Sequence, residues 1–226
     1  MITSLVGLEK LSLMYYVLVN DFNLDEPSIS NINSIPDEIE VSLAERVWLH
    51  AVNDSIKLQR ALDHFSGFES DIFFDTKKNK FELRHWPDQG ETNIFLEKHL
   101  SKVKNSSKTP HIWLDFKNLK FLDTNEIQKA IISLEKLINQ IGIEKELIII
   151  ESQSAKSLAK FKKNGFNCSL WVPKLKPNLL SKRDLELWSE NILRDLIDYD
   201  LRLISLDVSM HSYALIFLPN VQKMFW

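Results

Sequence analysis

The sequence predicts an α/β fold, a TIM-type (β/α) barrel, and three observations lead to this prediction. From residue 45 onward, strand-like and helix-like segments alternate along the chain, as expected for a parallel sheet covered by helices. Several strand-like segments are near-continuous apolar runs, which indicates burial on both faces. The chain has only five glycines and carries neither a GxGxxG motif nor a P-loop, the usual nucleotide-binding motifs of an open doubly wound sheet. The barrel is therefore favoured over the open sheet.

The strand-like segments are rich in β-branched and aromatic residues, and turn residues separate them. Two of them form a pair around the turn sequence TKKNK, and the last is the short apolar fragment QKMFW. In chain order, the expected strands are 46–53, 68–75, 80–86, 111–118, 146–152, 166–173, 201–209 and 222–226.

The helix-like segments show apolar residues at steps of three and four, together with start and stop signals. Asp54 and Ser181 are the expected N-caps of two of them, and Gly142 ends the best-marked one. The expected helices are 54–65, 91–104, 127–141, 157–165, 181–198 and 211–218.

The end of the chain poses a question about barrel closure. Residues 222–226 resemble strand seven of a barrel, and a closed eight-stranded barrel needs one more strand. Two alternatives remain open. Either the N-terminal segment helps to cover the gap, or the chain is a truncated product with an exposed sheet edge.

Residues 1–44 are expected to form an N-terminal helix and a polar linker that precede the barrel domain, 45–226. The apolar run Leu11–Val19 is too short to span a bilayer and is followed by Asn20 and Asp21, not by a small-residue cleavage site. We expect a short amphipathic or buried helix here, with a targeting remnant as the alternative. No transmembrane segment is predicted, and the predicted location is cytoplasmic.

Composition excludes several classes of function. The chain has 226 residues, 44% of them hydrophobic and 26% charged, as in ordinary globular domains. The formal net charge of −3 gives no electrostatic footprint for nucleic acid or an anionic membrane. Cys168 is the single cysteine, which excludes an intrachain disulfide framework and a cysteine-based zinc site. Oligomeric state is left open.

Two carboxylates share one face of an expected strand. Residues i and i+2 of a strand point the same way, so Glu69 and Asp71 face together, as do Asp115 and Lys117 on the following strand. Converging carboxylates repel each other unless one is protonated or a cation lies between them. Oxygen ligands suit a hard divalent ion, so one Mg²⁺ or Ca²⁺ is the expected cofactor.

Other polar residues lie near the ends of expected strands. His50 ends the first strand, and His85 ends the arm of the strand pair next to the two acids. Because the carboxyl ends of barrel strands carry the chemistry, both histidines are candidates for acid–base work. The remaining candidates line the substrate cavity, with helix capping or loop hydrogen bonding as the alternative role: Glu151, Gln153 and Asp207. Core packing is expected for Trp86, Trp113 and Trp171, with contact to a lipid or a sugar as the alternative.

The order of these residues resembles that of the glycerophosphodiester phosphodiesterase-like barrels, also called PLC-like phosphodiesterases. The resemblance rests on His50, Glu69-x-Asp71, His85 and Asp115-x-Lys117, and extends to sphingomyelinase D-type phospholipases. The short motifs HAVN, LRHWP and LDFK are most similar to the menorin family. The resemblance implies a metal ion on Glu69, Asp71 and Asp115, and catalysis by His50, His85 and Lys117.

Two departures from the family pattern affect this interpretation. Glycerophosphodiesterases have Arg-Gly after the first histidine, where this chain has Ala51 and Val52. A phosphate-binding cation is therefore missing, and Lys117 or Asn53 would have to compensate. The third acid is Asp115, where that branch has glutamate.

These observations predict a metal-dependent phosphodiester hydrolase that acts on a glycerophosphodiester- or phospholipid-like substrate by His/His acid–base catalysis. The expected partner is a small-molecule or lipid-derived phosphodiester, and no nucleic acid. The alternative is a non-catalytic binding or scaffold protein on the same barrel. The missing Arg-Gly and last strand favour the alternative, whereas the presence of all six ionisable residues favours the enzyme. A zinc hydrolase fits poorly, because no HExxH motif is present.

Overall fold

The computed structural model describes residues 47–86, 90–106, 109–176 and 179–226. The chain divides into two units, 1–36 and 37–226, and all described residues belong to the second. The helix and linker expected in residues 1–44 lie outside the described residues. Among the described residues, no helix is long and apolar enough to cross a membrane.

The domain is built on an eight-stranded sheet that is parallel except for one strand. The antiparallel exception is β3 (Lys80–Leu83), which forms a hairpin with β2. The parallel strands follow the spatial order β1 (Trp48–Leu49), β2 (Gly67–Asp75), β4 (His111–Phe116), β5 (Ile148–Ser152), β6 (Asn167–Trp171), β7 (Leu203–Leu206) and β8 (Gln222–Phe225).

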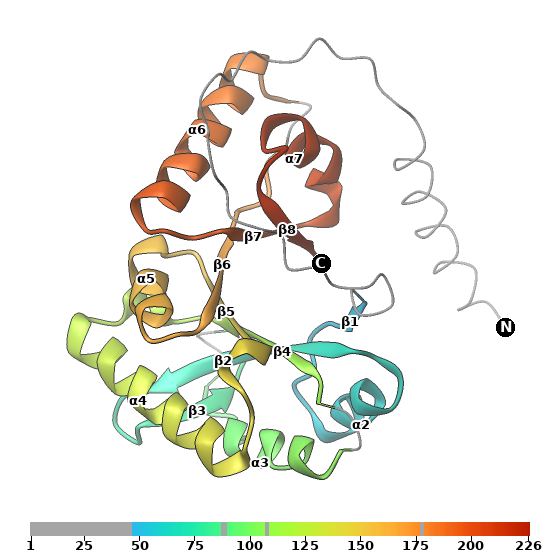
Figure 1. Cartoon of the computed structure of the whole chain (residues 1–226), viewed down its shortest axis with the longest axis vertical. Helices are drawn as coiled ribbons and strands as arrows, with labels where there is room; N and C mark the ends of the chain where they lie inside the picture. Colours follow the sequence, from blue (N-terminus) through green and yellow to red (C-terminus); the bar gives the residue numbers. More distant parts are fainter. Residues whose placement is uncertain (1–46, 87–89, 107–108, 177–178) are drawn as a thin grey trace, which may run out of the picture. The chain divides into compact units, whose positions relative to one another are not determined.

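Helices connect the parallel strands and lie around the sheet in Figure 1. They are α2 (Ser55–His64), α3 (Leu96–Leu100), α4 (Thr124–Ile141), α5 (Ala155–Lys163), α6 (Lys182–Asp198) and α7 (His211–Phe217). The α/β fold with repeated strand–helix units confirms the predicted TIM-type architecture.

The caps expected from the sequence are present. The Asp54 side chain accepts hydrogen bonds from the Ile56 and Lys57 amides at the start of α2. Ser181 forms a capping box with Asp184 at the start of α6, and Gly142 ends α4 in the left-handed conformation, with φ of 80°. These local signals fixed the helix ends because each one satisfies backbone groups that the helix leaves unpaired.

The expected helix 91–104 is wrong over its first half. Residues 90–94 are not helical, and α3 begins at Leu96. The Leu83 amide donates to the Ile94 carbonyl at 2.8 Å, and Phe95 forms an isolated bridge with Glu82. Pairing with β3 therefore holds this segment extended, a tertiary contact that overrides the helical periodicity.

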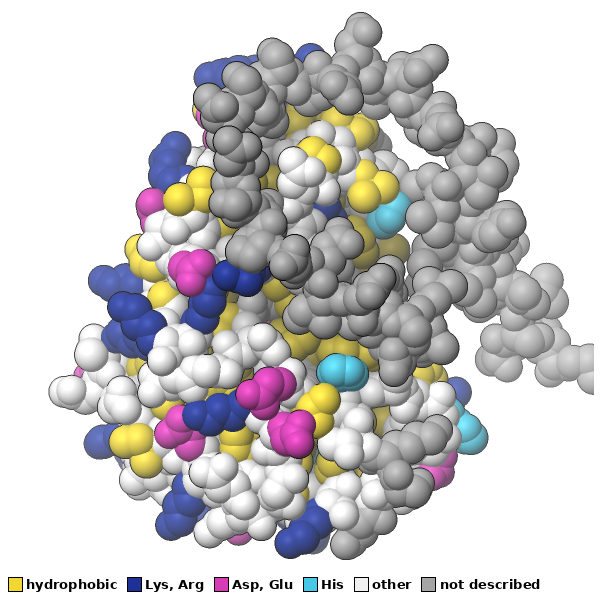
Figure 2. All heavy atoms as spheres, in the orientation of Figure 1, with side chains coloured by type: hydrophobic (Ala, Val, Ile, Leu, Met, Phe, Trp, Pro, Cys, Tyr) yellow, Lys and Arg dark blue, Asp and Glu magenta, His cyan; other side chains and the backbone are white. Residues whose placement is uncertain are grey.

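The two faces of the sheet have different surroundings. One face packs against the helices and carries the apolar core, including Phe68, Ile72, Ile112, Leu114, Ile150 and Ile204. The alternate residues form what we call the interior face, since side chains alternate along a strand. The interior face holds the acidic residues Glu69, Asp71, Asp115 and Glu151 of β2, β4 and β5. The outer surface in view in Figure 2 mixes basic, acidic and apolar side chains, in keeping with the small net charge.

Gly67 shows how tightly the interior face is packed near β1. A Cβ atom at this position would meet the Trp48 ring at 2.7 Å and the His111 carbonyl at 2.8 Å. The Trp48 ring instead crosses the space above the glycine and stacks on His111, with ring centroids 5.2 Å apart. The absence of a side chain on β2 thus lets its two neighbouring strands touch through their aromatic rings.

The sheet remains open within the described residues, because β1 and β8 are its two ends and are not paired with each other. Residues 222–225 form β8, the last parallel strand, as expected. The two ends nevertheless come close together. The Trp226 ring, just after β8, lies parallel to the His50 ring just after β1, with centroids 6.3 Å apart. The sheet therefore curls toward a barrel without closing into one.

His99 predicts a specific dependence of stability on pH. It lies on α3, is 5% exposed, contacts the Phe68 ring and is hydrogen-bonded to the Val52 carbonyl. Burial, and then nearby Lys102, lowers the pKa of His99 from 6.5 to about 4. The folded protein therefore favours neutral His99. Its contribution to the free energy of unfolding is present above pH 6.5 and is lost as the pH falls toward 4.

Urea denaturation at pH 7 and pH 4 tests this expectation. When the pH falls from 7 to 4, the free energy of unfolding of wild type should decrease by about 3 kcal/mol more than that of His99→Gln. The reason is that a shift of one pKa unit corresponds to about 1.4 kcal/mol. The exposed His64→Gln variant is the control and should follow the wild-type pH dependence. A constant difference between His99→Gln and wild type would contradict the expectation.

Candidate functional site

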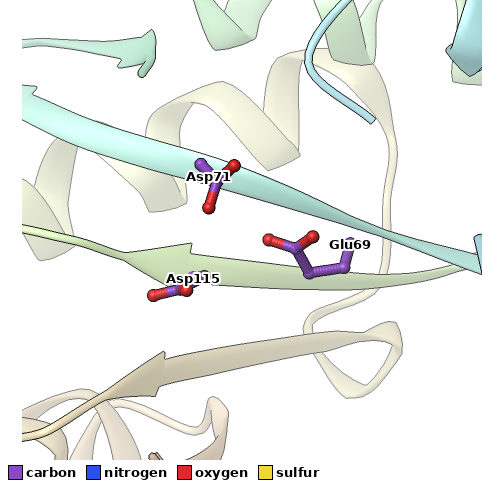
Figure 3. A group of neighbouring side chains, drawn as sticks. All are labelled: Glu69, Asp71 and Asp115. Atoms are coloured by element: carbon purple, nitrogen blue, oxygen red, sulfur yellow. The ribbon is translucent and has the colours of Figure 1, made fainter. Parts of the chain in front are cut away.

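The predicted acidic residues come together on the interior face of β2 and β4. Asp71 and Asp115 are register partners on the two strands, and Glu69 is two residues before Asp71. Each offers a carboxylate oxygen, and these atoms lie within 4.8 Å of one another. Figure 3 shows the three side chains pointing toward a common region. We call Glu69, Asp71 and Asp115 the acidic triad.

Lys117 supplies positive charge to two members of the triad. Its Nζ atom lies 2.7 Å from Asp71 Oδ1 and also pairs with Asp115 Oδ2. Burial opposes the charge on Lys117, but Asp115 and Asp71 outweigh it and raise the pKa of Lys117 above its ordinary value. The ammonium group therefore stays charged and reduces the repulsion between the two carboxylates.

Asp71 is the most fully hydrogen-bonded member of the triad. Asn53 Nδ2 donates to Asp71 Oδ2 at 2.5 Å, and the Asp71 amide donates to Asn53 Oδ1 at 2.9 Å. His85 Nδ1 lies 2.9 Å from the same Oδ2. Burial alone would raise the pKa of Asp71, but Lys117 and the hydrogen bonds from Asn53 and His85 outweigh it, so the pKa lies below its usual range.

Glu69 is buried and only partly paired. Its Oε2 accepts a 2.6 Å hydrogen bond from the Ala51 amide and lies 3.4 Å from His50 Nε2. Its Oε1 has no hydrogen-bond partner among the described residues. Burial, and then the charge of Asp71, raises the pKa of Glu69 to about 8.

The backbone after β1 is strained where it meets Glu69. Ala51 has a φ of 56°, in the left-handed region that residues with a Cβ atom rarely adopt. This conformation presents the Ala51 amide to Glu69, and the next amide, Val52 N–H, donates to the Glu69 carbonyl at 2.8 Å. The departure from the family's Arg-Gly sequence therefore coincides with a backbone contact to the triad.

The two histidines flank the triad and remain accessible. The side chains of His50 and His85 are 55% and 40% exposed. Burial lowers the pKa of His50, and nearby Asp71 partly opposes this effect. His85 packs against the edge of Trp86, with centroids 4.4 Å apart. Both rings can thus reach a molecule bound at the triad.

Glu151 on β5 extends the acidic row. It is the register partner of Asp115 and is 1% exposed. Its Oε2 has no hydrogen-bond partner among the described residues. Burial, and then the charge of Asp115, raises the pKa of Glu151 well above its ordinary value.

The two other substrate-binding candidates have local partners. Gln153 accepts a 2.6 Å hydrogen bond from Lys120. Asp207 caps the short helix Val208–Met210 and pairs with Lys174 at 3.0 Å. These contacts agree with the alternative of capping and loop hydrogen bonding. Two neighbours of the site were not indicated by the sequence: Trp226, whose ring lies parallel to that of His50, and Ser205, which lies beside the Glu151 carboxyl.

A cleft of about 570 Å³ lies away from the triad, between β3 and α4. Its lining includes the exposed residues Lys80, Lys129, Lys136 and Glu97 and the floor residues Phe81 and Leu137. It contains no buried carboxylate or histidine. We therefore place the candidate chemistry at the triad and not in this cleft.

The triad fits a hard divalent cation. All three donors are carboxylate oxygens, which Mg²⁺ and Ca²⁺ prefer. The unpaired and buried Oε1 of Glu69 is the specific observation in favour, because a buried carboxylate oxygen without a partner is costly. The choice between Mg²⁺ and Ca²⁺ is not fixed by these residues.

No protein-family model matches the sequence, and no curated protein matches it significantly. Solved structures do match it in fold. A proposed glycerophosphoryl diester phosphodiesterase from Silicibacter pomeroyi superposes with a TM-score of 0.56 at 9% identity, over 80% of this chain and 82% of that one. A proposed glycerophosphodiester phosphodiesterase from Galdieria sulphuraria gives 0.54 at 12% identity, over 79% and 82%.

A phosphodiesterase from Oleispira antarctica, solved in complex with the product sn-glycerol-3-phosphate, gives a TM-score of 0.50 at 10% identity, over 76% of each chain. At these identities the likeness shows the fold. The chain therefore has the TIM-type α/β fold that the sequence resemblance implies, with a sheet that stays open between β1 and β8, and the finer resemblance to menorins stays a prediction.

Replacing Lys117 by methionine should make stability depend on divalent cations. The variant keeps the length of the side chain but leaves Asp71 and Asp115 without their ammonium partner. Removing one partner of a buried ion pair lowers the free energy of unfolding by about 3–5 kcal/mol. Because Lys117 is 21% exposed, we expect Lys117→Met to be about 2–3 kcal/mol less stable than wild type in EDTA.

Thermal denaturation in EDTA and in excess Mg²⁺ measures this effect. Mg²⁺ should raise the melting temperature of Lys117→Met more than that of wild type, since the cation replaces the missing charge. Lys120→Met, which removes an exposed lysine, should behave like wild type. A Lys117→Met protein that is as stable as wild type in EDTA would show that the ammonium group does not hold the triad together.

Proposed function

We propose that the protein is a metal-dependent phosphodiester hydrolase acting on a glycerophosphodiester- or phospholipid-like substrate. The observation that carries the proposal is the buried acidic triad with an unpaired Glu69 oxygen and an accessible histidine on either side. The fold shared with glycerophosphodiester phosphodiesterases supports it, as does the neighbour that binds sn-glycerol-3-phosphate.

Glu69, Asp71 and Asp115 would hold one Mg²⁺ or Ca²⁺. A bound divalent cation supplies a Lewis acid that neutralises charge on the phosphoryl oxygens. Lys117 adds a fixed positive charge beside Asp71 and Asp115, where it stabilises the additional negative charge of the transition state. Lys117 thereby takes over the anion-binding role left open by Ala51 and Val52.

The histidines carry the proton transfers. His85 Nδ1 is engaged by Asp71, which leaves Nε2 as the atom that exchanges a proton with the substrate. His50 approaches the site from β1 on the opposite side of β2 from β4. One histidine removes the proton of the attacking oxygen and the other protonates the leaving alkoxide. The attacking oxygen belongs to water or to a substrate hydroxyl, and the second case gives a cyclic phosphate.

A second candidate function is a non-catalytic binding or scaffold protein. The specific observation that favours it is Lys117, which already forms ion pairs with two of the three carboxylates without a metal ion. A site that is satisfied by its own lysine can persist as a structural ion-pair network.

Calorimetric titration with Mg²⁺ and with Ca²⁺ separates the two functions. Wild type should bind one ion, and Asp71→Asn should lose this binding because a ligand carboxylate is removed. Asp207→Asn, which changes a capping carboxylate elsewhere, is the matched control. Asp115→Asn provides a second ligand variant, and near-UV circular dichroism checks the folding of each protein. A folded wild type that binds neither ion would overturn the metal-dependent hydrolase.

Loss of either histidine should slow turnover strongly without abolishing metal binding. We expect His50→Asn and His85→Asn to reduce the hydrolysis rate by about 10²–10⁴-fold, the typical contribution of a general acid or base. The measurement is ³¹P NMR of glycerophosphodiesters with different head groups, which also distinguishes a cyclic phosphate from a monoester. Variants with wild-type rates would remove the histidines from the mechanism.

A further inference from the structure

The polar contact that holds the His50 ring is weak. His50 directly follows β1, which has only two residues, and it precedes Ala51, whose backbone is in the left-handed region. Its Nε2 atom lies 3.4 Å from Glu69 Oε2, beyond the usual hydrogen-bond distance. Its side chain is 55% exposed. The orientation of the ring therefore depends on a contact from another part of the sheet.

Trp226 provides this contact from the opposite end of the sheet. Its amide donates to the Leu206 carbonyl at 3.1 Å, and its carbonyl accepts from the Val208 amide at 3.0 Å. The backbone at Trp226 therefore continues the pairing of β7 with β8 by one residue. Because both of its backbone groups are bonded to the β7 segment, the point from which the Trp226 side chain extends is fixed.

The Trp226 ring belongs to the interior face. Side chains two residues apart on a strand point to one face, so Trp226 points the same way as Met224. Met224 is the register partner of Ser205, and Ser205 lies beside the Glu151 carboxyl on the interior face. Trp226 follows the last residue of β8. Its ring therefore lies at the carboxyl ends of the strands, where His50 also lies.

Three parallel rings connect β6 to His50. The Trp226 ring is tilted by 5° from the Trp171 ring and by 11° from the His50 ring, with centroids 6.2 Å and 6.3 Å away. Both separations are within the range of interacting aromatic pairs. The rings cross the gap between β8 and β1, the two ends of the sheet, which come close together in Figure 1. Within the described residues, ring contacts thus replace strand pairing at this gap.

We propose that Trp226 is a positioning residue, which holds the His50 ring in place from across the gap between β8 and β1. This inference rests on the proposed phosphodiesterase function, in which His50 transfers a proton. The indole N–H is a hydrogen-bond donor only, so Trp226 acts on the reaction through His50. The effect is geometric, because a displacement of about 1 Å from the productive position can slow a reaction about 10²-fold.

The second histidine is held in a different way. His85 Nδ1 lies 2.9 Å from Asp71 Oδ2, a normal hydrogen-bond distance. The Trp86 ring meets the His85 ring edge-on, at an interplanar angle of 86°. Since Asp71 already orients His85, the position of this ring should not depend on Trp86. Trp86 is therefore a matched control for Trp226.

The mobility of the His50 ring tests the proposal without substrate or cation. In protein labelled with ring-¹³C histidine, NMR relaxation measures the mobility of each ring, and His50→Asn identifies the His50 signal. In wild type and Trp226→Phe, His50 should be about as ordered as the buried His99. In Trp226→Leu and Trp226→Met, it should become about as mobile as the exposed His64. Trp86→Leu should leave the order of His50 unchanged.

Two results of this measurement would overturn the proposal. One is a His50 ring that is already as mobile as His64 in wild type. The other is a His50 ring that stays ordered in both non-aromatic variants of Trp226. Melting temperatures check that each variant is folded.

Steady-state kinetics show whether Trp226 acts through His50. With a glycerophosphodiester substrate, Trp226→Leu should lower kcat about tenfold to hundredfold and leave KM within about twofold. Trp226→Phe should restore most of the rate. In the His50→Asn background, Trp226→Leu should have no further effect on kcat, because a residue that works through another is fully coupled to it in a double-mutant cycle.

The kinetic outcomes distinguish this inference from the proposed function. A raised KM with an unchanged kcat would make Trp226 a substrate contact. An equal loss of rate in both backgrounds would make its role independent of His50. Either result would overturn the inference and leave the hydrolase intact. A wild type without hydrolase activity would overturn the proposed function and the catalytic importance of Trp226 with it, whereas ring mobility would still decide whether Trp226 holds His50.

Discussion

The parallel pairing of β2 and β4 is the constraint on which the site depends. It sets Asp71 directly beside Asp115, in a position where both carboxylates are largely removed from water. Two such charges cannot remain side by side unless positive charge or a proton offsets their repulsion. The Lys117 ammonium between them and the hydrogen bonds to Asp71 meet this requirement.

Glu69 and Asp71 also hold the segment after β1 against the sheet. β1 is only two residues long, too short to be held by strand pairing alone. The segment that follows it is joined to β2 by Ala51 N–H to Glu69 Oε2 and by Asn53 to Asp71. His50 belongs to this segment, so its position depends on the triad. Side chains that would bind the cation therefore also orient a catalytic candidate, and changes to one will affect the other.

The sequence could predict contacts within a strand but not between strands. Two-residue parity was enough to place Glu69 with Asp71 on one face of their strand, and Asp115 with Lys117 on one face of theirs. Register between strands depends on the packing of the whole sheet, so the alignment of Asp115 with Glu151 and of Glu151 with Ser169 was not predictable. The helix expected at 91–104 failed for the same reason, because pairing with β3 extends its first half. The parallel rings of His50 and Trp226 depend on the curl of the sheet, which no local pattern encodes.

The interior face is divided into two chemically different halves. β2 and β4 carry the charged groups, whereas β6 and β7 carry neutral hydroxyls, and Glu151 on β5 lies at the boundary. A phosphodiester has a corresponding division between an anionic phosphoryl group and neutral alcohol groups. In the proposed enzyme, the divalent cation and Lys117 would attract the phosphoryl group whatever the alcohol is, so this charge alone would give little selectivity among diesters. Hydrogen bonds discriminate more strongly, because a ligand that lacks a hydroxyl leaves a buried protein group unpaired. In the proposed enzyme, the cation ligands, the lysine and both histidines would therefore all come from β1, β2, β4 and the segment after β3, on one side of this boundary.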